Sequence, residues 1–384
     1  MTDVYCSTKF KELQVHVQGR LLYNCCKAWP ERVDLDWLEK NPGKLFHTPT
    51  MVADRESMLS GNRSKSCEYG CYRYEDQGLI STRNRNKIKE FISDIYSPLT
   101  NLNISLSTDC NLSCAYCGSE WSTAWGKDIR QNGEYLIDGY RNQEDNWVKL
   151  WSKVKQKDRG LESKFFTMLL KEISITPSIK KISILGGEPL LNNQLYELLD
   201  IIKDKEIQIT SGLGVDNARF IKIVNLIKYK KNISFAVSAE ATNDVFEFVR
   251  HGARWHDFLQ KVNYMKKNGV AISFVSTITN LTSFGVMSFY DFFDKEHHIS
   301  YNPITNRPFL QPNVLDDLSK KILIKSLEDR TDNVFFSNLI RDVSQEHTNE
   351  QRQNLGIFLK EFSKRRNLRL DVFPAHFLKW LDLN

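Results

Sequence analysis

The sequence predicts an α/β fold, with a barrel of parallel strands and helices between a cysteine-rich N-terminal region and a helical C-terminal extension. Apolar segments alternate with helical segments along the middle of the 384-residue chain. The expected strands are 101–106, 180–185, 206–210, 233–240 and 270–278, and the expected helices are 165–173, 193–203, 218–228 and 255–267. Strands that alternate with helices of this length pair in parallel through right-handed crossovers. The strands are almost continuously apolar, which is typical of a sheet whose faces are covered.

Three regions are expected along the chain. A cysteine-rich domain is expected at residues 1–98, the barrel at 99–310 with an insertion at 119–164, and a helical extension at 311–384. The extension reads as several amphipathic helices. We interpret its basic run at 360–370 as the solvated face of a helix, the alternative being contact with phosphates.

The N-terminal region has weaker patterns. Apolar and polar residues alternate around Gly19 at 13–24, which predicts a β-hairpin. Residues 27–66 are expected to be irregular and rich in loops. A helix is expected at 82–96, ending before Pro98.

Composition restricts the class of protein. A secreted disulfide scaffold is short and spreads its cysteines over the chain, whereas this chain has eight in 384 residues and none after Cys117. No apolar run follows Met1, and no stretch approaches the roughly 18 apolar residues of a membrane helix. We therefore expect a cytoplasmic protein without a membrane partner, in which clustered thiols bind metal more often than they form bridges. The net charge of +6 permits an anionic partner without requiring one.

Three cysteines lie within eight residues, just after the first expected strand of the series. Their spacing is Cys110-x3-Cys114-x2-Cys117, with Tyr116 before the last cysteine. Three thiolates this close can hold three irons of a cubane cluster and leave the fourth iron without a protein ligand. The alternatives are a structural zinc site that lacks one local ligand, or reduced cysteines in a loop. In barrel folds the chemistry lies at the C-terminal ends of the strands, where this motif falls.

Polar residues also follow two other expected strands. The segment Gly186–Glu188 ends the second strand, where glycine allows a ligand to approach the backbone and a carboxylate can accept from an ammonium group. Ser238 and Glu240 end the fourth strand on one face and could bridge the two hydroxyls of a ribose. Arg250 could pair with a carboxylate through two parallel hydrogen bonds. Each feature alone is more often structural than functional.

Taken together, residues from about 100 to 310 resemble the radical S-adenosylmethionine (SAM) superfamily, whose fold is a partial (β/α)6 barrel. The resemblance rests on the three cysteines with Tyr116, then on Gly186-Gly187-Glu188-Pro189, then on Ser238 and Glu240, in the order of the family. It implies that Cys110, Cys114 and Cys117 carry a catalytic [4Fe-4S] cluster whose open iron binds SAM. Reductive cleavage of SAM would give methionine and a 5′-deoxyadenosyl radical, which takes a hydrogen atom from the substrate.

The resemblance also implies roles for individual residues around SAM. Gly186, Gly187 and Glu188 would hold the methionine amino group, Ser238 and Glu240 the ribose, and Arg250 the carboxylate. Val275 and Ser276 would lie next to the adenine through their backbone, with Asn280 as a further candidate. The cofactor-binding residues so implied are Tyr116, Gly186, Gly187, Glu188, Ser238, Glu240, Arg250 and Val275.

The other five cysteines lie in the N-terminal region and resemble the pattern of twitch and SPASM auxiliary-cluster domains, although those domains usually follow the barrel. They are Cys6, Cys25, Cys26, Cys67 and Cys71. Four of five thiolates would suit a second, auxiliary [4Fe-4S] cluster. Only one of Cys25 and Cys26 is expected to bind it, since adjacent residues on a strand point to opposite faces, and we favour Cys26. A tetrahedral zinc site is the alternative.

The predicted function is therefore a radical SAM enzyme that abstracts a hydrogen atom from its substrate. An auxiliary cluster favours oxidation or bond formation, and the expected partners are a small-molecule or peptide substrate and a flavodoxin- or ferredoxin-type electron donor. One alternative is an enzyme that modifies ribosomally synthesised peptides. The other is a non-catalytic protein that binds zinc and nucleic acid, which needs basic surfaces near the cysteines. The stretch STDCNLSCAYCGSEW has two acidic residues and no lysine or arginine, so nucleic acid is not an expected partner.

Overall fold

The chain forms two compact units of parallel strands and helices. The computed structural model describes residues 4–76, 78, 81–85, 90–137 and 158–383. The first unit contains residues 1–107 and 152–208, and the second contains residues 108–151 and 209–384. Strands pair in parallel within each unit, which confirms the predicted α/β class with parallel pairing.

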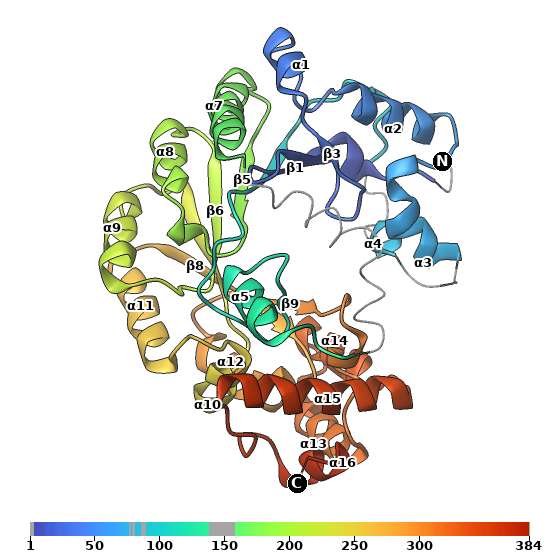
Figure 1. The fold of residues 1–384 in the computed structure, drawn as a ribbon, viewed down its shortest axis with the longest axis vertical. Coiled ribbons are helices and arrows are strands. Elements are labelled where there is room, and N and C mark those ends of the chain that lie inside the picture. Colours follow the sequence, from blue (N-terminus) through green and yellow to red (C-terminus); the bar gives the residue numbers. More distant parts are fainter. Residues whose placement is uncertain (1–3, 77, 79–80, 86–89, 138–157, 384) are drawn as a thin grey trace. The chain divides into compact units, whose positions relative to one another are not determined.

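The sheet of the first unit has the strand order β3-β2-β1-β4-β5 (Figure 1). Its strands are β1 (Glu12–His16), β2 (Leu21–Tyr23), β3 (Glu31–Arg32), β4 (Asn101–Ser105) and β5 (Lys181–Leu185). β1 and β2 pair in antiparallel fashion with Val15 opposite Leu22, so the hairpin predicted around Gly19 is confirmed. On its other side β1 pairs in parallel with β4, where Val15 lies opposite Ile104. The N-terminal hairpin is therefore continuous with the strand that precedes the cysteine motif.

Several helices of different length belong to the first unit. They are α1 (Leu35–Lys40), α2 (Pro49–Leu59), α3 (Arg73–Asp76), α4 (Thr82–Arg85), α7 (Arg159–Ile175) and α8 (Gln194–Ile201). The Asp158 side chain accepts a hydrogen bond from the amide of Leu161 and starts α7. Phe165, Leu169 and Ile173 then recur every four residues on the buried face of that helix.

Two expectations for the N-terminal region are wrong. The stretch 27–66 is not irregular, because it contains α1 and α2. α2 starts with Thr48, whose hydroxyl accepts from the amide of Met51, and with a proline at its first position. The helix expected at 82–96 covers only α4 among the described residues, and 90–96 is not helical. There Asp94 accepts from the amide of Tyr96 and forms a turn instead.

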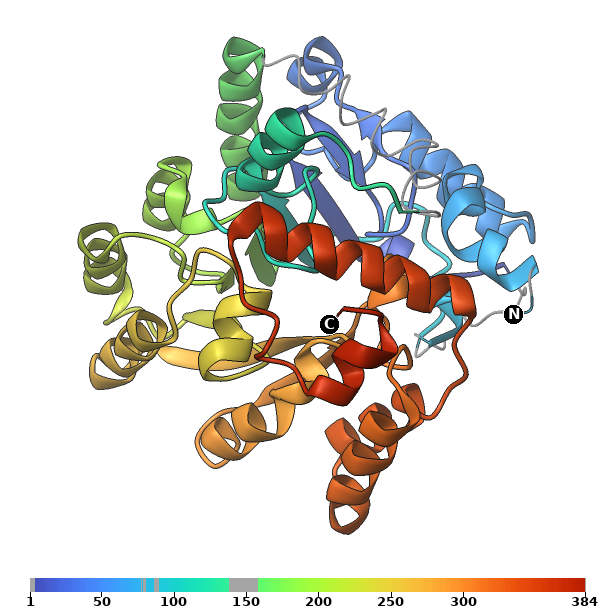
Figure 2. The ribbon, with the colours of Figure 1, turned by 60° about the horizontal axis from the view of Figure 1, so that its bottom comes forward.

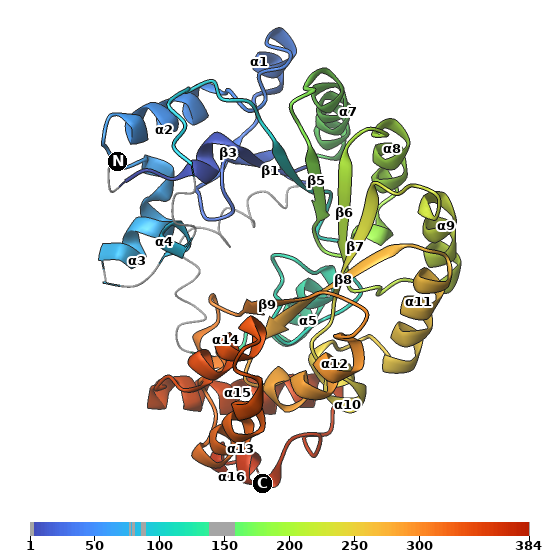
Figure 3. The same ribbon diagram turned by 180° about the vertical axis from the view of Figure 1, so that it is seen from behind.

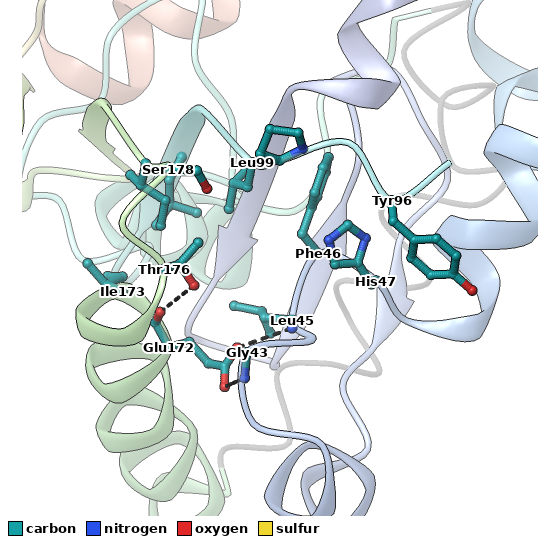
Figure 4. Close-up of a pocket in the computed structure, with 13 residues that line it drawn as sticks. Gly43, Leu45, Phe46, His47, Tyr96, Leu99, Glu172, Ile173, Thr176 and Ser178 are labelled. Carbon is teal, nitrogen blue, oxygen red and sulfur yellow. Dashed lines mark hydrogen bonds between the residues drawn. The ribbon is translucent and has the colours of Figure 1, made fainter. Parts of the chain in front are cut away.

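A buried carboxylate ties the loop before α2 to α7. Glu172 of α7 accepts hydrogen bonds from the amides of Gly43 at 2.7 Å and Leu45 at 3.2 Å (Figure 4). The loop lies beside a cavity of about 220 Å³, which is also lined by His47 and Tyr96. Since the amides of Gly43 and Leu45 both have their partner on the helix, α7 helps to fix the course of the chain between α1 and α2.

A buried ionic network holds the N-terminal segment. Asp54 of α2 accepts from the ammonium of Lys9 at 2.8 Å, from Asn24 at 3.0 Å and from the hydroxyl of Ser64 at 2.6 Å. The Lys9 side chain is fully buried, and 8% of the Asp54 side chain is exposed. Three segments distant in sequence therefore converge on one carboxylate.

The second unit contains the parallel strands β7 (Ile233–Ser238), β8 (Ala271–Ile278) and β9 (Ile299–Pro303) (Figure 3). Ser238 lies opposite Val275, and Val275 lies opposite Ser300. β9 was not predicted. β6 (Glu206–Ser211) begins in the first unit and ends in the second. The helices between and around the strands are α5 (Thr123–Asn132), α9 (Asn217–Ile227), α10 (Asn243–Val249), α11 (Trp255–Lys267) and α12 (Val286–Phe293).

The C-terminal extension is helical, as predicted. It contains α13 (Asp317–Leu327), α14 (Val334–Val343), α15 (Asn349–Arg366) and α16 (Ala375–Trp380). Figure 2 shows the long α15 lying beside α5, where the rings of Trp125 and Phe362 are 5.8 Å apart. The basic run at 360–370 is not simply a solvated face, because only 6% of the Arg365 side chain and 4% of the Arg366 side chain are exposed. None of the helices in the described ranges combines the length and the hydropathy that crossing a bilayer requires.

We predict that Asp54→Ala destabilises the first unit by about 3–5 kcal/mol, because it leaves the Lys9 ammonium buried without its counter-charge. The measurement is native-state hydrogen exchange of amides in residues 4–67. Asp76→Ala serves as the control, since it breaks an exposed pair with Arg63 in the same unit and should change little. Equal effects of the two substitutions would contradict the prediction.

The same carboxylate gives a pH dependence. Burial alone would raise the pKa of Asp54. Lys9 and the hydroxyl donors lower it by more than burial raises it, so the resulting pKa is below the ordinary value. A carboxyl with a depressed folded-state pKa contributes its full stability above the unfolded value of about 3.9 and loses it as the pH falls through the folded value. The stability difference between the native chain and Asp54→Asn should therefore shrink below about pH 4.

Candidate active site

The cysteine loop, residues 110–117, has no regular secondary structure and opens the second unit. The N-terminal end of α5 holds one side of it. The amide of Cys110 donates to the hydroxyl of Thr123 at 3.0 Å, and that hydroxyl donates to the carbonyl of Cys110 at 2.9 Å. The indole of Trp125 donates to the carbonyl of Cys114 at 2.9 Å. Two of the three motif cysteines are thus fixed through their backbone by one helix.

The other side of the loop is held by the end of α10. The amide of Ser113 donates to the carbonyl of His251 at 2.9 Å, and the amide of Ala115 donates to the carbonyl of Val249 at 2.7 Å. These partners lie more than 130 residues further along the chain. The loop is therefore positioned by tertiary contacts and not by its own sequence alone.

The thiol of Cys117 lies close enough to those of Cys110 and Cys114 for both to raise its pKa. Cys114 is buried, while Cys110 and Cys117 are half-buried. Burial raises the pKa of Cys117, the neighbouring Cys114 raises it further, and Arg307 opposes the shift. Burial also raises the pKa of Cys114, with Arg250 opposing it. Three soft sulfur donors in such a setting need bound positive charge to become thiolates, and the irons of a cluster would supply it.

Tyr116, Glu240 and Arg250 form a buried hydrogen-bonded network next to this loop. The Tyr116 hydroxyl donates to Glu240 Oε1 at 2.9 Å, and Arg250 Nη1 donates to Glu240 Oε2 at 3.2 Å and also to the Tyr116 hydroxyl. Glu240 is fully buried and Arg250 is 3% exposed. Burial raises the pKa of Glu240, and Arg250 and Tyr116 counteract that rise. The structure thus brings together three residues that the sequence proposed separately.

The network leaves one donor for a ligand. Arg250 Nε is buried and has no hydrogen-bond partner among the described residues. A buried donor without a partner is costly, and an acceptor from a bound molecule would satisfy it. Gly212, after β6, lies against the guanidinium, since a Cβ there would come within 2.6 Å of Arg250 Nη2. The arrangement fits the carboxylate-binding role implied for Arg250.

The segment Gly186–Glu188 lies in the first unit, at the end of β5. The Gly187 amide donates to the carbonyl of Ser107 at 2.9 Å. Gly186 has a φ of +129°, and a Cβ there would come within 2.7 Å of the same carbonyl, so glycine is required. Glu188 is 2% exposed and accepts from the amide of Leu190 at 3.2 Å. This carboxylate therefore already caps its own turn.

The candidate adenine neighbours lie in β8 and just after it. Val275 is the register partner of Ser238, so these two predicted positions are adjacent across β7 and β8. Ser276 is buried and donates to the carbonyl of Ala239 at 2.7 Å. The side-chain amide of Asn280 donates to the carbonyls of residues 309 and 314. Its side chain is thus engaged in fixing the chain after β9.

Four of the five N-terminal cysteines line one small cavity of the first unit. They are Cys6, Cys25, Cys67 and Cys71. Cys26, which we favoured over Cys25, is exposed and does not line the cavity. Burial raises the pKa of Cys6, Cys67 and Cys71, to about 11 for Cys67. Among the described residues, no group of three or more histidine, cysteine or carboxylate side chains is arranged to hold a metal ion.

Two residues of the site were missed by the sequence reasoning. Arg307, after β9, is 3% exposed, donates to the carbonyl of Tyr116 at 3.1 Å and interacts with Glu120. Arg366 of α15 donates to the hydroxyl of Ser113 at 3.2 Å. Both lie more than 180 residues from the loop they contact, and no spacing in the sequence marks them.

Residues 104–293 match the sequence model of the radical SAM superfamily. No curated protein matches the sequence. Among solved structures, anSMEcpe with bound AdoMet is similar, with 14% identity and a TM-score of 0.39 over 60% of each chain. SuiB of Streptococcus suis bound to S-adenosylmethionine has 15% identity and a TM-score of 0.36, over 89% of this chain and 75% of SuiB. SuiB bound to its precursor peptide SuiA has 13% identity and a TM-score of 0.39, over 84% of this chain and 69% of SuiB.

This chain spans 60% of the length of anSMEcpe. The matched range begins within β4 and ends with α12. It therefore includes the cysteine loop, the segment Gly186–Glu188 and the network of Tyr116, Glu240 and Arg250. These elements occur there in the order that the resemblance requires. Residues 104–293 of the chain are therefore a domain of the radical SAM superfamily.

Proposed function

We propose that the protein is an enzyme that reductively cleaves SAM and abstracts a hydrogen atom from its substrate. The observation that carries the proposal is the cysteine loop itself, whose backbone is fixed from two sides and in which Cys110 and Cys114 both raise the pKa of Cys117. When bound, a [4Fe-4S] cluster and SAM would supply the one-electron cleavage that gives methionine and a 5′-deoxyadenosyl radical. The residues of the chain bind, orient and shield these groups.

The residues around the loop suggest how this chain would hold SAM. Cys110, Cys114 and Cys117 would bind three irons. Arg250, whose Nε lacks a partner among the described residues, would bind the carboxylate of SAM. Glu240 and Tyr116 would hold the guanidinium in place, because both hydrogen-bond to it.

Other groups would contact the rest of SAM. The segment Gly186–Glu188 would contact the amino group, Ser238 and Glu240 the ribose, and Val275 the adenine. Glu240 would then accept hydrogen bonds from the ribose and from Arg250 at the same time, because its two carboxylate oxygens have several acceptor sites. A flavodoxin- or ferredoxin-type donor would supply the electron.

A second metal centre in the first unit is part of the proposal. The four-thiol cavity, lined by Cys6, Cys25, Cys67 and Cys71, has the number of thiols that an auxiliary [4Fe-4S] cluster with four protein ligands needs. In this structure the four side chains are not arranged to hold a metal ion, so they would have to move together to bind the cluster. Because Cys26 is exposed, Cys25 is the better candidate ligand of the adjacent pair Cys25 and Cys26, which we call the doublet. Such a cluster would accept an electron from a substrate radical, which favours oxidation or bond formation on a small molecule or a peptide.

Replacing Cys110, Cys114 and Cys117 together by alanine should remove about four irons per chain, because the three thiolates hold one cluster. It should also abolish 5′-deoxyadenosine formation from SAM under dithionite. Iron analysis and chromatography of anaerobically purified protein measure the two effects. A triple variant that still cleaves SAM would refute the catalytic role of the loop.

Glu240→Gln should weaken SAM binding by about 1–3 kcal/mol, or about 5- to 150-fold in Kd, because a buried charged hydrogen-bond acceptor is lost. The substitution keeps the size of the side chain, and iron content should not change. Anaerobic equilibrium dialysis with the iron-loaded protein measures the affinity. Glu296→Gln, at an exposed carboxylate of the same unit, is the matched control. An unchanged Kd for Glu240→Gln would exclude its role in binding SAM.

The doublet offers a matched pair of variants for the four-thiol cavity. Cys25→Ser should remove about half of the iron, because Cys25 lines the cavity, and Cys26→Ser should leave the iron content intact. The cleavage of SAM should persist in both variants, whereas turnover of the true substrate should fail in Cys25→Ser. Loss of iron from Cys26→Ser and not from Cys25→Ser would assign Cys26 as the ligand. Zinc in place of iron in the native protein would exclude an electron-accepting role.

A further inference from the structure

We propose that Arg366, at the C-terminal end of α15, is a positioning residue that holds the cysteine loop in its ligand-presenting shape. The inference rests on the proposed function only in treating the loop cysteines as cluster ligands. The contacts that carry it belong to the protein without a cluster.

Arg366 hydrogen-bonds in three directions from a buried position. Its Nε donates to the hydroxyl of Ser113 at 3.2 Å, its Nη1 to the hydroxyl of Tyr135 at 2.7 Å, and its Nη2 to Asp128 Oδ2 at 3.4 Å. Only 4% of its side chain is exposed. Ser113 lies immediately before Cys114. One guanidinium therefore joins the C-terminal helix to the loop and to the segment around α5.

Arg366 also packs against the helix that holds the loop. Its guanidinium carbon lies 4.5 Å from the centre of the Trp125 ring and 4.1 Å from that of Phe362. The indole of Trp125 in turn donates to the carbonyl of Cys114. Arg366 thus reaches the loop by two routes, directly through Ser113 and indirectly through Trp125. A lysine could not make these contacts together, because it lacks the planar, forked group.

The neighbouring Arg365 secures the other end of α5. Its Nη1 donates to the carbonyl of Gly133 at 2.8 Å and lies 3.4 Å from Asp128 Oδ2, and its guanidinium carbon lies 4.1 Å from the Tyr135 ring centre. Asp128 is therefore shared by both arginines. Arg365 therefore holds the C-terminal end of α5, whereas Arg366 contacts both the segment around α5 and the cysteine loop.

Ser113, which accepts the hydrogen bond from Arg366, also bonds to His251 through both its backbone and its side chain. Its amide donates to the carbonyl of His251, and its hydroxyl lies 2.9 Å from Nδ1 of the same histidine. The hydroxyl can accept from Arg366 and still donate to His251. The side chain therefore lies between α15 and the end of α10, so that loss of Arg366 frees the loop on the α15 side only.

The test uses hydrogen exchange of the chain prepared without iron. Arg366→Ala should speed exchange of amides in residues 110–117 by about 10- to 100-fold, because a charged hydrogen bond to the loop is lost. Arg366→Lys should restore only part of the protection. Arg369→Ala is the matched control, since Arg369 is 83% exposed and pairs with Asp371. Ser113→Ala, which removes only the hydroxyl, should raise exchange in the loop and make a further Arg366→Ala change less effective.

The loaded protein gives a second readout. The rate at which a chelator removes iron, and the electron paramagnetic resonance spectrum of the reduced cluster, should change in Arg366→Ala and not in Arg369→Ala. Unchanged exchange of residues 110–117 in both Arg366→Ala and Ser113→Ala would overturn the proposal, whatever the iron content. If exchange rises but the cysteine triple variant keeps its iron, the positioning role stands and the proposed cluster ligands are wrong.

Discussion

The site depends on hydrogen bonds that hold an irregular eight-residue loop by its backbone. Because the cysteine loop has no helix or strand of its own, partners elsewhere must satisfy its polar groups and fix its shape. Thr123 and Trp125 do so from α5, and the carbonyls of Val249 and His251 do so from the end of α10. A cluster ligand must be presented at a defined position, so on the proposed function the folding of the second unit would be a condition for cluster binding.

Buried ion pairs occur at several contacts between segments of the described chain. Glu240 with Arg250, Asp54 with Lys9, and Asp128 with two arginines are all ion pairs with little exposure. A buried pair contributes little net stability compared with apolar side chains of the same size, because desolvation offsets the attraction. Such a pair instead favours one specific geometry, since a buried charged group has few other partners that can satisfy it. We infer that these networks fix the positions of the chain segments that they join.

The sequence predicted the parts of the protein that depend on local pattern. The alternation of apolar strands and helices gave the α/β class, and spacing alone marked Cys110 to Cys117. Helices α1 and α2 were missed, because capping by Asp34 and Thr48 starts them without a strong amphipathic period. The position of Cys25 in the four-thiol cavity and the burial of Arg365 could not be read from the sequence either. Both depend on which segments meet in the fold, and charged runs look alike whether solvated or paired.

The two groups of cysteines differ in how far the chain must close to assemble them. The loop cysteines lie within eight residues, so little chain entropy is lost in bringing them together, and hydrogen bonds already fix the loop. The four-thiol cavity draws on segments from Cys6 to Cys71, with longer loops between its cysteines. Burial raises the pKa of Cys6, Cys67 and Cys71, so a metal that bound there would have to displace protons. Metal binding should therefore be coupled to folding more strongly at the cavity than at the loop.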